Sequence, residues 1–165
     1  MTSDNMQILE ISLTSDPAEL GKVRKQVEAF TDKLGFSEWC QTQIVLAIDE
    51  SLTNIIRHAY QNAPGKPIEL KICATDKILK ISIRDFGSQS DPRKFKSRDI
   101  RDLRPGGLGV KIMKKCMDCV QYTPAPEGGT ILTMCKDLTK SEHSPVSPHE
   151  NPDRKLHKHK RQNSN

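Results

Sequence analysis

Hydrophobic residues near the amino terminus recur first at every second position and then at helical spacing. Between residues 9 and 13 apolar and polar residues alternate, which predicts a half-buried β-strand. Asp16 and Pro17 then predict the start of a helix, with Glu19 as the acid of a capping box. Gly35 is placed to end this first helix. The apolar positions of the helix are Leu20, Val23, Val27, Phe30 and Leu34.

A second helix is predicted from Ser37, a residue type that caps helix amino termini well, to about Tyr60. The turn at residues 62–65, which contains Pro64 and Gly65, stops it. We expect one stripe of this helix to face the core. The apolar positions of the stripe are Ile44, Ile48, Leu52, Ile55 and Ala59.

Two further strands are predicted at residues 68–72 and 79–83, where apolar residues again alternate with polar ones. The polar turn at residues 75–77 is short enough to join them as an antiparallel hairpin. Between residues 87 and 105 the pattern gives way to mixed charges, which predicts a long loop. Compact domains keep such loops for function or mobility.

The remaining elements complete one layered domain. Residues 106–109 open a helix that extends to about Met117, and strands follow at about residues 120–123 and 130–136. The order βααββαββ predicts an α/β (α+β) two-layer sandwich, with the helices on one face of a mostly antiparallel, mixed sheet.

The length and composition agree with a single domain. The chain has 165 residues, which suits one domain with a short appendage rather than a multi-domain enzyme. Hydrophobic residues make up 35%, enough for a core, whereas 4% aromatic residues argue against a surface that stacks nucleobases. The formal net charge of +5 suggests a polyanionic partner, so the distribution of the charge matters.

Residues 139–165 carry much of this charge, because six bases and three acids give them +3 and leave +2 for the rest. Only two aliphatic residues occur there, too few to offset the loss of chain entropy on folding. We therefore expect a folded domain at 1–138 and a basic, disordered tail at 139–165. His157 and His159 could form a metal or nucleic-acid arm, but a solvated tail is favoured, and direct nucleic-acid binding is not expected.

The five cysteines and the absence of a signal-like segment favour a reduced, cytoplasmic protein. The longest clear apolar run, residues 44–48, is too short to span a membrane. Cys116 and Cys119 form a CxxC pair that could be a redox motif or half of a zinc site. No second CxxC follows, so cysteines that pack in the core are the favoured interpretation.

Three polar groups interrupt the apolar pattern where a ligand could reach them. Glu50, Asn54 and His58 follow one edge of the second helix at intervals of four, although such spacing is more often a solvated face. Asp85 and Gly87 follow a strand, where a carboxylate could accept a hydrogen bond while the glycine admits a ligand; an ordinary turn is the alternative.

The third group is Gly106-Gly107-Leu108-Gly109 at the start of a helix. Flexible backbone with unpaired N–H groups can bind a phosphate there, and a plain glycine hinge is about as good an interpretation of this stretch alone.

Together, the three groups resemble the N, G1 and G2 boxes of the Bergerat-fold ATPases: Glu50-x-x-x-Asn54, Asp85-x-Gly87 and Gly107-x-Gly109. Within that superfamily, residues 49–60 resemble the N box of the anti-sigma-factor serine/threonine protein kinases, and Gly128-Gly129-Thr130 also fits. The likeness covers about residues 9–138. It implies the Bergerat ATP-binding fold, with ATP and Mg²⁺ as cofactors.

The resemblance also implies a role for each matching residue. Asn54 would bind Mg²⁺ through its side-chain oxygen, and Glu50 would be the general base that accepts a hydroxyl proton. Asp85 would accept a hydrogen bond from the adenine amino group, helped by Thr130. The glycines would leave room for the base or offer N–H groups to the phosphates: Gly87 for the base, Gly107 and Gly109 for the phosphates.

The function implied is that of an anti-sigma regulatory factor that binds a sigma factor and phosphorylates a small antagonist protein. The resemblance also suggests a homodimer. Residues 88–90 depart from the superfamily pattern, because more elaborate members have a second glycine at about Gln89. The alternative is therefore a nucleotide-gated module that sequesters its partner without phosphorylating it.

Overall fold

The computed structural model describes residues 6–87 and 108–139. Five strands and three α-helices make up this part of the chain, with a 3₁₀ turn, η1, and a π-helical turn, η2. Their order is β1 (Gln7–Thr14), η1 (Pro17–Glu19), α1 (Leu20–Lys33), α2 (Glu38–Asn54), η2 (Ile55–Ala59), β2 (Pro67–Ala74), β3 (Ile78–Asp85), α4 (Leu108–Cys116), β4 (Cys119–Pro124) and β5 (Thr130–Asp137).

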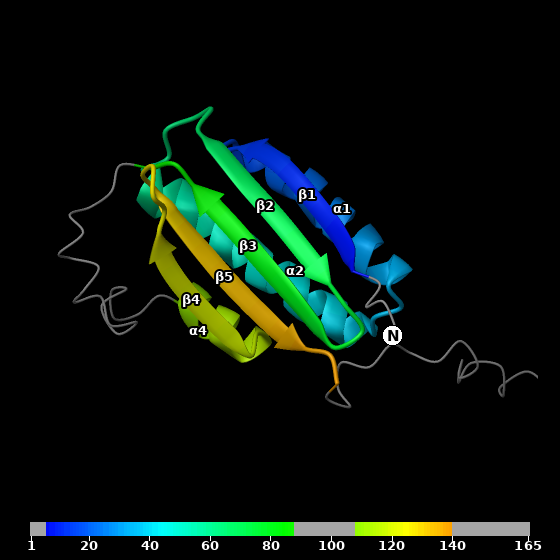
Figure 1. Cartoon of the computed structure of the whole chain (residues 1–165). Helices are drawn as coiled ribbons and strands as arrows, with labels where there is room; N and C mark the ends of the chain where they lie inside the picture. The colour runs from blue at the N-terminus through cyan, green and yellow to red at the C-terminus, as the bar shows by residue number, and fades with distance from the viewer. Residues whose placement is uncertain (1–5, 88–107, 140–165) are drawn as a thin grey trace, which may run out of the picture.

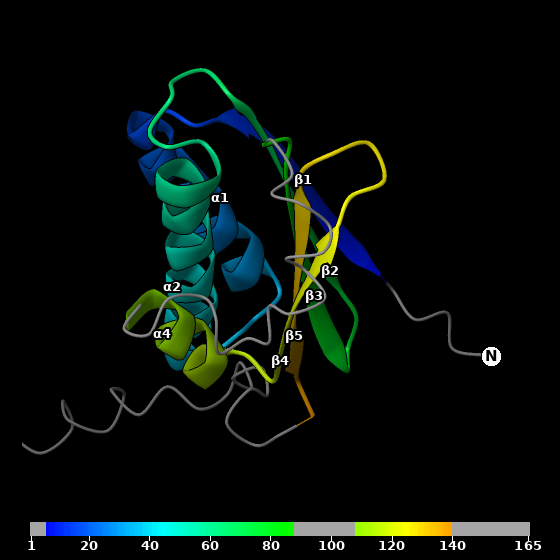
Figure 2. The same ribbon diagram turned by 90° about the vertical axis from the view of Figure 1, so that its left-hand side faces the viewer.

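The strands form one sheet in the order β1-β2-β3-β5-β4, and the helices cover one face of it (Figures 1 and 2). The two-layer sandwich predicted from the sequence is therefore confirmed. The structure sharpens the prediction of a mostly antiparallel, mixed sheet, because every strand pairing among the described residues is antiparallel. The predicted hairpin is the β2–β3 pair, in which Ile72 lies opposite Ile81.

Alternation in the strands and helical periodicity in α2 meet in one core. Ile44, Ile48 and Leu52 of α2 are fully buried, as the predicted stripe requires. They face a sheet whose inward side chains are equally buried, among them Leu70, Ile72, Ile81, Ile83, Leu132 and Met134. Helix α2 lies between α1 and α4, so it is the central element of the helical layer (Figure 1).

The ends of α1 and the start of α2 follow from local chemistry. Gly35 has φ +74°, and its N–H donates to the carbonyl of Asp32 while Phe36 N–H donates to Thr31, which is a Schellman motif. Ser37 Oγ accepts from Cys40 N–H at 3.3 Å and caps α2 as predicted. The predicted capping box differs, because Glu19 accepts from Thr14 N–H and not from its own N-cap residue, Asp16.

The predicted second helix does not remain α-helical to Tyr60. It continues from Asn54 as the π-helical turn η2, in which Tyr60 N–H donates to the Ile55 carbonyl. The wider turn accompanies burial of the Tyr60 ring, whose hydroxyl is bonded to the backbone of β2 and of the segment after β3. The change from α-helix to π-helix therefore coincides with hydrogen bonds between Tyr60 and residues distant in the sequence.

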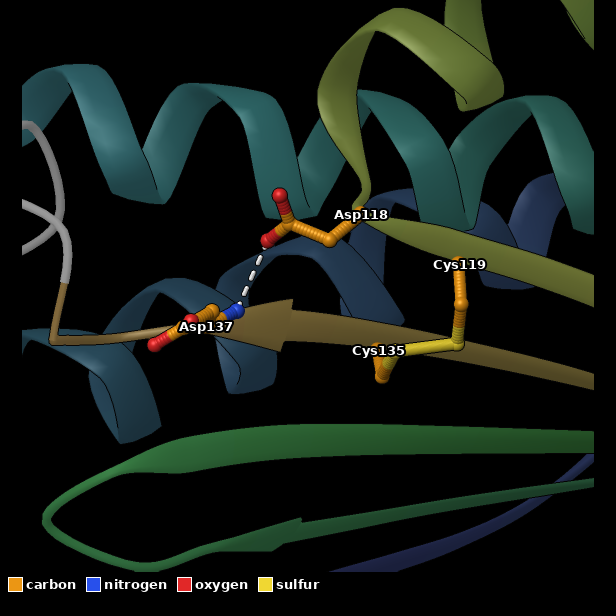
Figure 3. The surroundings of a disulfide bond; sticks show 4 residues. All are labelled: Asp118, Cys119, Cys135 and Asp137. Carbon is orange, nitrogen blue, oxygen red and sulfur yellow. Dashed lines mark hydrogen bonds between the residues drawn. A yellow bond between two sulfur atoms is a disulfide. The ribbon is translucent and has the colours of Figure 1, made fainter.

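The prediction of a reduced cysteine that packs in the core is wrong for Cys119, because it forms a disulfide with Cys135 (Figure 3). The two residues lie opposite each other on β4 and β5, with their Cα atoms 5.0 Å apart. Cys116 is a buried, free cysteine, as expected for a packing residue. In the described part of the chain no three His, Cys, Asp or Glu side chains gather as a metal site would require.

Several predictions lie outside the described residues: the charged loop at 88–105, Gly107, and the tail beyond residue 139. Among the helices that the structure does describe, none has the length and apolarity needed to cross a membrane.

Candidate active site

Helix α2 and the start of α4 bring three of the predicted site residues together. A Cβ atom added at Gly109 of α4 would overlap with Oε2 of Glu50 and would lie 3.5 Å from Nδ2 of Asn54. Glu50 and Asn54, one helical turn apart, are both half-buried. The α4 backbone can approach this carboxylate and this amide only because residue 109 has no side chain.

Ser51 and two methionines hold α4 in this position. Ser51 is buried, and its hydroxyl donates to the Ala47 carbonyl at 2.6 Å. The same oxygen contacts the sulfur atoms of Met113 on α4 at 3.0 Å and Met134 on β5 at 3.7 Å. Between Glu50 and Asn54, α2 is thus fixed to both α4 and the sheet.

His58, the third member of the predicted helical edge, does not join this group. It lies in η2, and its side chain is exposed. The solvated-face interpretation therefore fits His58, whereas Glu50 and Asn54 face α4.

Asp85 ends β3 as a nearly buried carboxylate, with 5% of its surface exposed. Its Oδ1 accepts from Gly87 N–H at 3.0 Å. Burial raises the pKa of Asp85 above its ordinary value, while backbone hydrogen bonds from Gly87 and Thr130 act in the opposite direction. Thr130, the first residue of β5, thus meets Asp85 through its backbone N–H.

Gly87 and the end of η2 approach each other closely. A Cβ atom at Gly87 would lie 3.1 Å from the Ala59 carbonyl oxygen and 3.2 Å from Oδ1 of Asp85. The segment after β3 therefore lies against the same helical rod that carries Glu50 and Asn54, one turn beyond Asn54.

Tyr60, which the sequence predicts as the end of the second helix and of the stretch that resembles an N box, joins separate parts of the fold. Its hydroxyl donates to the Pro67 carbonyl of β2 and accepts from Phe86 N–H at 2.7 Å. Burial raises the pKa of Tyr60, and its neighbour Asp85 raises it further against the opposing hydrogen bond from Phe86. Tyr60 therefore connects η2 to the start of β2 and to the residue that follows Asp85.

Gly129 is a second residue whose importance the sequence shows only as part of a Gly-Gly pair. Its φ is +82°, and an added Cβ would overlap with the carbonyl of Asp85. The turn before β5 is thus pressed against the end of β3, which places Thr130 beside Asp85. The signal available in the sequence was the doublet before a strand.

Arg84 braces the same segment from the strand side. Its guanidinium lies 4.4 Å from the centre of the Phe86 ring, and Nη2 is 3.5 Å from Oε2 of Glu127 in the β4–β5 turn. The Glu127 side chain is 86% exposed, so solvent screens the pair and we assign its contribution mainly to orientation.

The residues present fit a nucleotide with its metal ion. Asp85 presents a buried acceptor beside close-packed glycine backbone, which suits a flat purine with an exocyclic amine. Asn54 supplies the hard oxygen that Mg²⁺ prefers, next to the Glu50 carboxylate. Gly107 belongs to the same predicted site and lies outside the described residues.

Comparison with known proteins matches the chain to a family of ATPase domains. Residues 13–136 match the model of the histidine kinase-like ATPase domain family. An anti-sigma F factor of Oceanobacillus iheyensis is 32% identical over 105 residues, which are 61% of this chain and 72% of that protein. A serine-protein kinase RsbW of Halalkalibacterium halodurans is 27% identical over 144 residues, 82% of this chain and 86% of the relative.

A solved structure supports the fold. The crystal structure of the RsbU and RsbW domains of a Mycobacterium tuberculosis protein matches with a TM-score of 0.58 at 19% identity. The match covers 79% of this chain, which spans about a third (32%) of that longer chain.

Proposed function

The chain belongs to the histidine kinase-like ATPase domain family, and from this premise we propose that it is a Mg-ATP-dependent serine/threonine protein kinase acting as an anti-sigma factor. Its relatives include proteins named anti-sigma F factor and serine-protein kinase. The observation that carries the proposal is the convergence of Glu50, Asn54 and Gly109 where α4 begins.

Nucleotide binding is divided between two groups of residues. Asp85 would accept a hydrogen bond from the adenine amino group, with Thr130 beside it and Gly87 leaving space for the base. Gly107 and Gly109 would offer backbone N–H groups to the phosphates at the start of α4. Asn54 would hold Mg²⁺, which neutralises phosphate charge when bound.

We assign the role of general base to Glu50, because its carboxylate lies beside Gly109, where the phosphates would bind. Glu50 would accept the proton of a serine or threonine hydroxyl while the hydroxyl oxygen bonds to the γ-phosphorus of ATP. The bond from that phosphorus to the bridging oxygen breaks, and ADP leaves with the electron pair. Positioning supplies much of the rate enhancement in such transfers.

The proposed partners are a sigma factor, which the protein would bind, and a small antagonist protein, which it would phosphorylate. We place the activity in the cytoplasm and include a homodimer in the proposal. The relatives named anti-sigma F factor support the sigma factor as partner, and the relative named serine-protein kinase supports a protein substrate. The small antagonist follows from the resemblance of residues 49–60 to the N box of the anti-sigma-factor kinases.

A radiolabel assay with [γ-³²P]ATP and the cognate antagonist tests the catalytic role of Glu50. We expect Glu50→Gln to reduce phosphate transfer by about 10²- to 10⁴-fold, because the amide cannot accept the proton. Asp76→Asn is the control, since Asp76 is exposed in the turn between β2 and β3, at the opposite end of β3 from Asp85. Transfer at an unchanged rate in Glu50→Gln would contradict the assignment.

The departure at residues 88–90 favours a second candidate, a nucleotide-gated module that sequesters its partner without phosphorylating it. In that case the protein would capture the partner with no labelled product in either the parent or Glu50→Gln. Labelling of the antagonist by the parent protein would exclude this candidate.

A further inference from the structure

A groove on the outer side of the helical layer lies between α1 and α2, away from the nucleotide site. Its volume is about 750 Å³. Ala29 of α1 and Val45 of α2 contribute apolar surface, and acidic side chains surround it: Glu28 and Asp32 on α1, Glu38 and Asp49 on α2. Lys25 is the one base among the lining residues.

Three of these acids are available to a ligand. Asp49 is already paired with Arg24 at 2.6 Å. Within the described ranges, no ion pair engages Glu28, Asp32 or Glu38. The groove therefore combines uncompensated negative charge with an apolar surface, which suits a basic segment that carries an aliphatic residue.

The chain itself contains such a segment. Residues 154–161 read Arg-Lys-Leu-His-Lys-His-Lys-Arg, with five bases, two histidines and no acid. Leu156 is its only aliphatic residue. We propose that this basic segment docks in the acidic groove between α1 and α2 of the same chain, with Leu156 against the apolar surface.

The connection is long enough and starts in the right place. Lys136 on β5 donates to Oε1 of Gln43 at 2.7 Å, and Gln43 directly follows the groove residues Gln41 and Thr42 on α2. The residues from 139 to 153 can span about 50 Å when extended, at roughly 3.3 Å per residue. Helix α2, with 17 residues, is only about 25 Å long at 1.5 Å per residue.

Because the basic segment and the groove belong to one chain, a weak electrostatic contact is enough for docking. Within the same chain as the groove, the segment has a local concentration there on the order of millimolar. Contacts between exposed charges weaken as salt shortens the Debye length, so docking should be strong only at low ionic strength. This salt dependence gives the proposal a direct signature.

Nuclear magnetic resonance of the ¹⁵N-labelled full chain tests the proposal through the backbone amides of residues 154–161. At low salt we expect positive heteronuclear NOE values there and shifts away from random coil. Both should be lost in Glu28→Lys/Asp32→Lys and in about 0.5 M NaCl. The matched control is Glu69→Lys, which reverses an exposed acid on the sheet and should change neither.

A variant of the basic segment provides a second test that does not depend on whether the groove variant folds. Lys155→Glu/Lys158→Glu changes no residue that lines the groove and should shift the amides of Ala29 and Val45. Random-coil shifts for residues 154–161 in the parent protein at low salt would overturn the proposal. If the positive NOE values and the shifts away from random coil disappeared on tenfold dilution, the proposal would also be overturned, because docking would then require a second copy of the chain.

Discussion

Asp85, the proposed acceptor for the adenine amino group, shows at the scale of one residue how a role in binding can oppose stability. The carboxylate is almost fully buried, and its partners are backbone N–H groups rather than a cation. Burial disfavours the charged form and raises the pKa of Asp85. A buried acceptor of this kind is useful for recognising an amino group and unfavourable for the folded protein without its ligand.

Replacing Asp85 with Asn should therefore separate stability from binding. The folded pKa of Asp85 lies above the ordinary 3.8, so the folded state holds its proton more tightly than the unfolded state. The contribution of Asp85 to the free energy of unfolding is thus greatest below pH 3.8 and falls as pH rises through the folded pKa. Asp85→Asn, which does not titrate, should therefore gain stability relative to the parent over this rise.

Urea unfolding of both proteins between pH 4 and 7 measures this difference. The asparagine oxygen can still accept from Gly87 N–H, so the local turn should persist. ATP affinity should nevertheless fall at least about tenfold, because a charged acceptor is replaced by a neutral one. A parent and variant whose stability difference is constant with pH would contradict the burial argument.

At the scale of elements, local chemistry was sufficient where one segment determines its own structure. The alternation in residues 68–72, the cap at Ser37 and the glycine at position 35 all predicted the observed elements. The π-helical turn was not predictable in this way, because it accompanies contacts of Tyr60 with Pro67 and Phe86.

The site residues also divide into those that local spacing predicts and those that depend on how the whole chain folds. Glu50 and Asn54 could be grouped from their spacing alone, since a helix places residues four apart on one side. The overlap of Gly129 with the end of β3, and the pairing of Cys119 with Cys135, depend on strand order and register. The sequence shows the Gly-Gly doublet and the positions of the cysteines, but it does not show the strand order or the register that brings these residues into contact.

The disulfide between β4 and β5 should stabilise the edge of the sheet. It joins residues 16 apart, and a loop of this length predicts about 3 kcal/mol from the restricted unfolded state. Cys135→Ser should lower the urea midpoint of the oxidised protein, and dithiothreitol should lower that of the parent but not of the variant. Cys73→Ser, which removes a free cysteine on β2, is the control. Equal midpoints for the oxidised parent and Cys135→Ser would contradict the prediction.

At the scale of the whole molecule, α2 separates two surfaces. One side of the helix presents Glu50 and Asn54 to α4, and the other presents Val45 and Asp49 to the groove beside α1. The buried stripe between them fixes both to the sheet. A ligand on either side therefore acts on the same rigid element, and binding should be measurable as stabilisation of the entire domain.

Melting of the domain with and without Mg-ATP tests that consequence. At a ligand concentration 100 times the dissociation constant, binding adds about 2.7 kcal/mol, which corresponds to a rise in Tm of roughly 10 °C. Asn54→Ala should abolish the part of the shift that depends on Mg²⁺, because it removes the proposed oxygen ligand. Thr53→Ala, one residue earlier on α2, should retain the shift. If Asn54→Ala and chelation of Mg²⁺ both leave the full shift in place, Asn54 does not hold the metal ion, and nucleotide binding rests on the Asp85 side of the site alone.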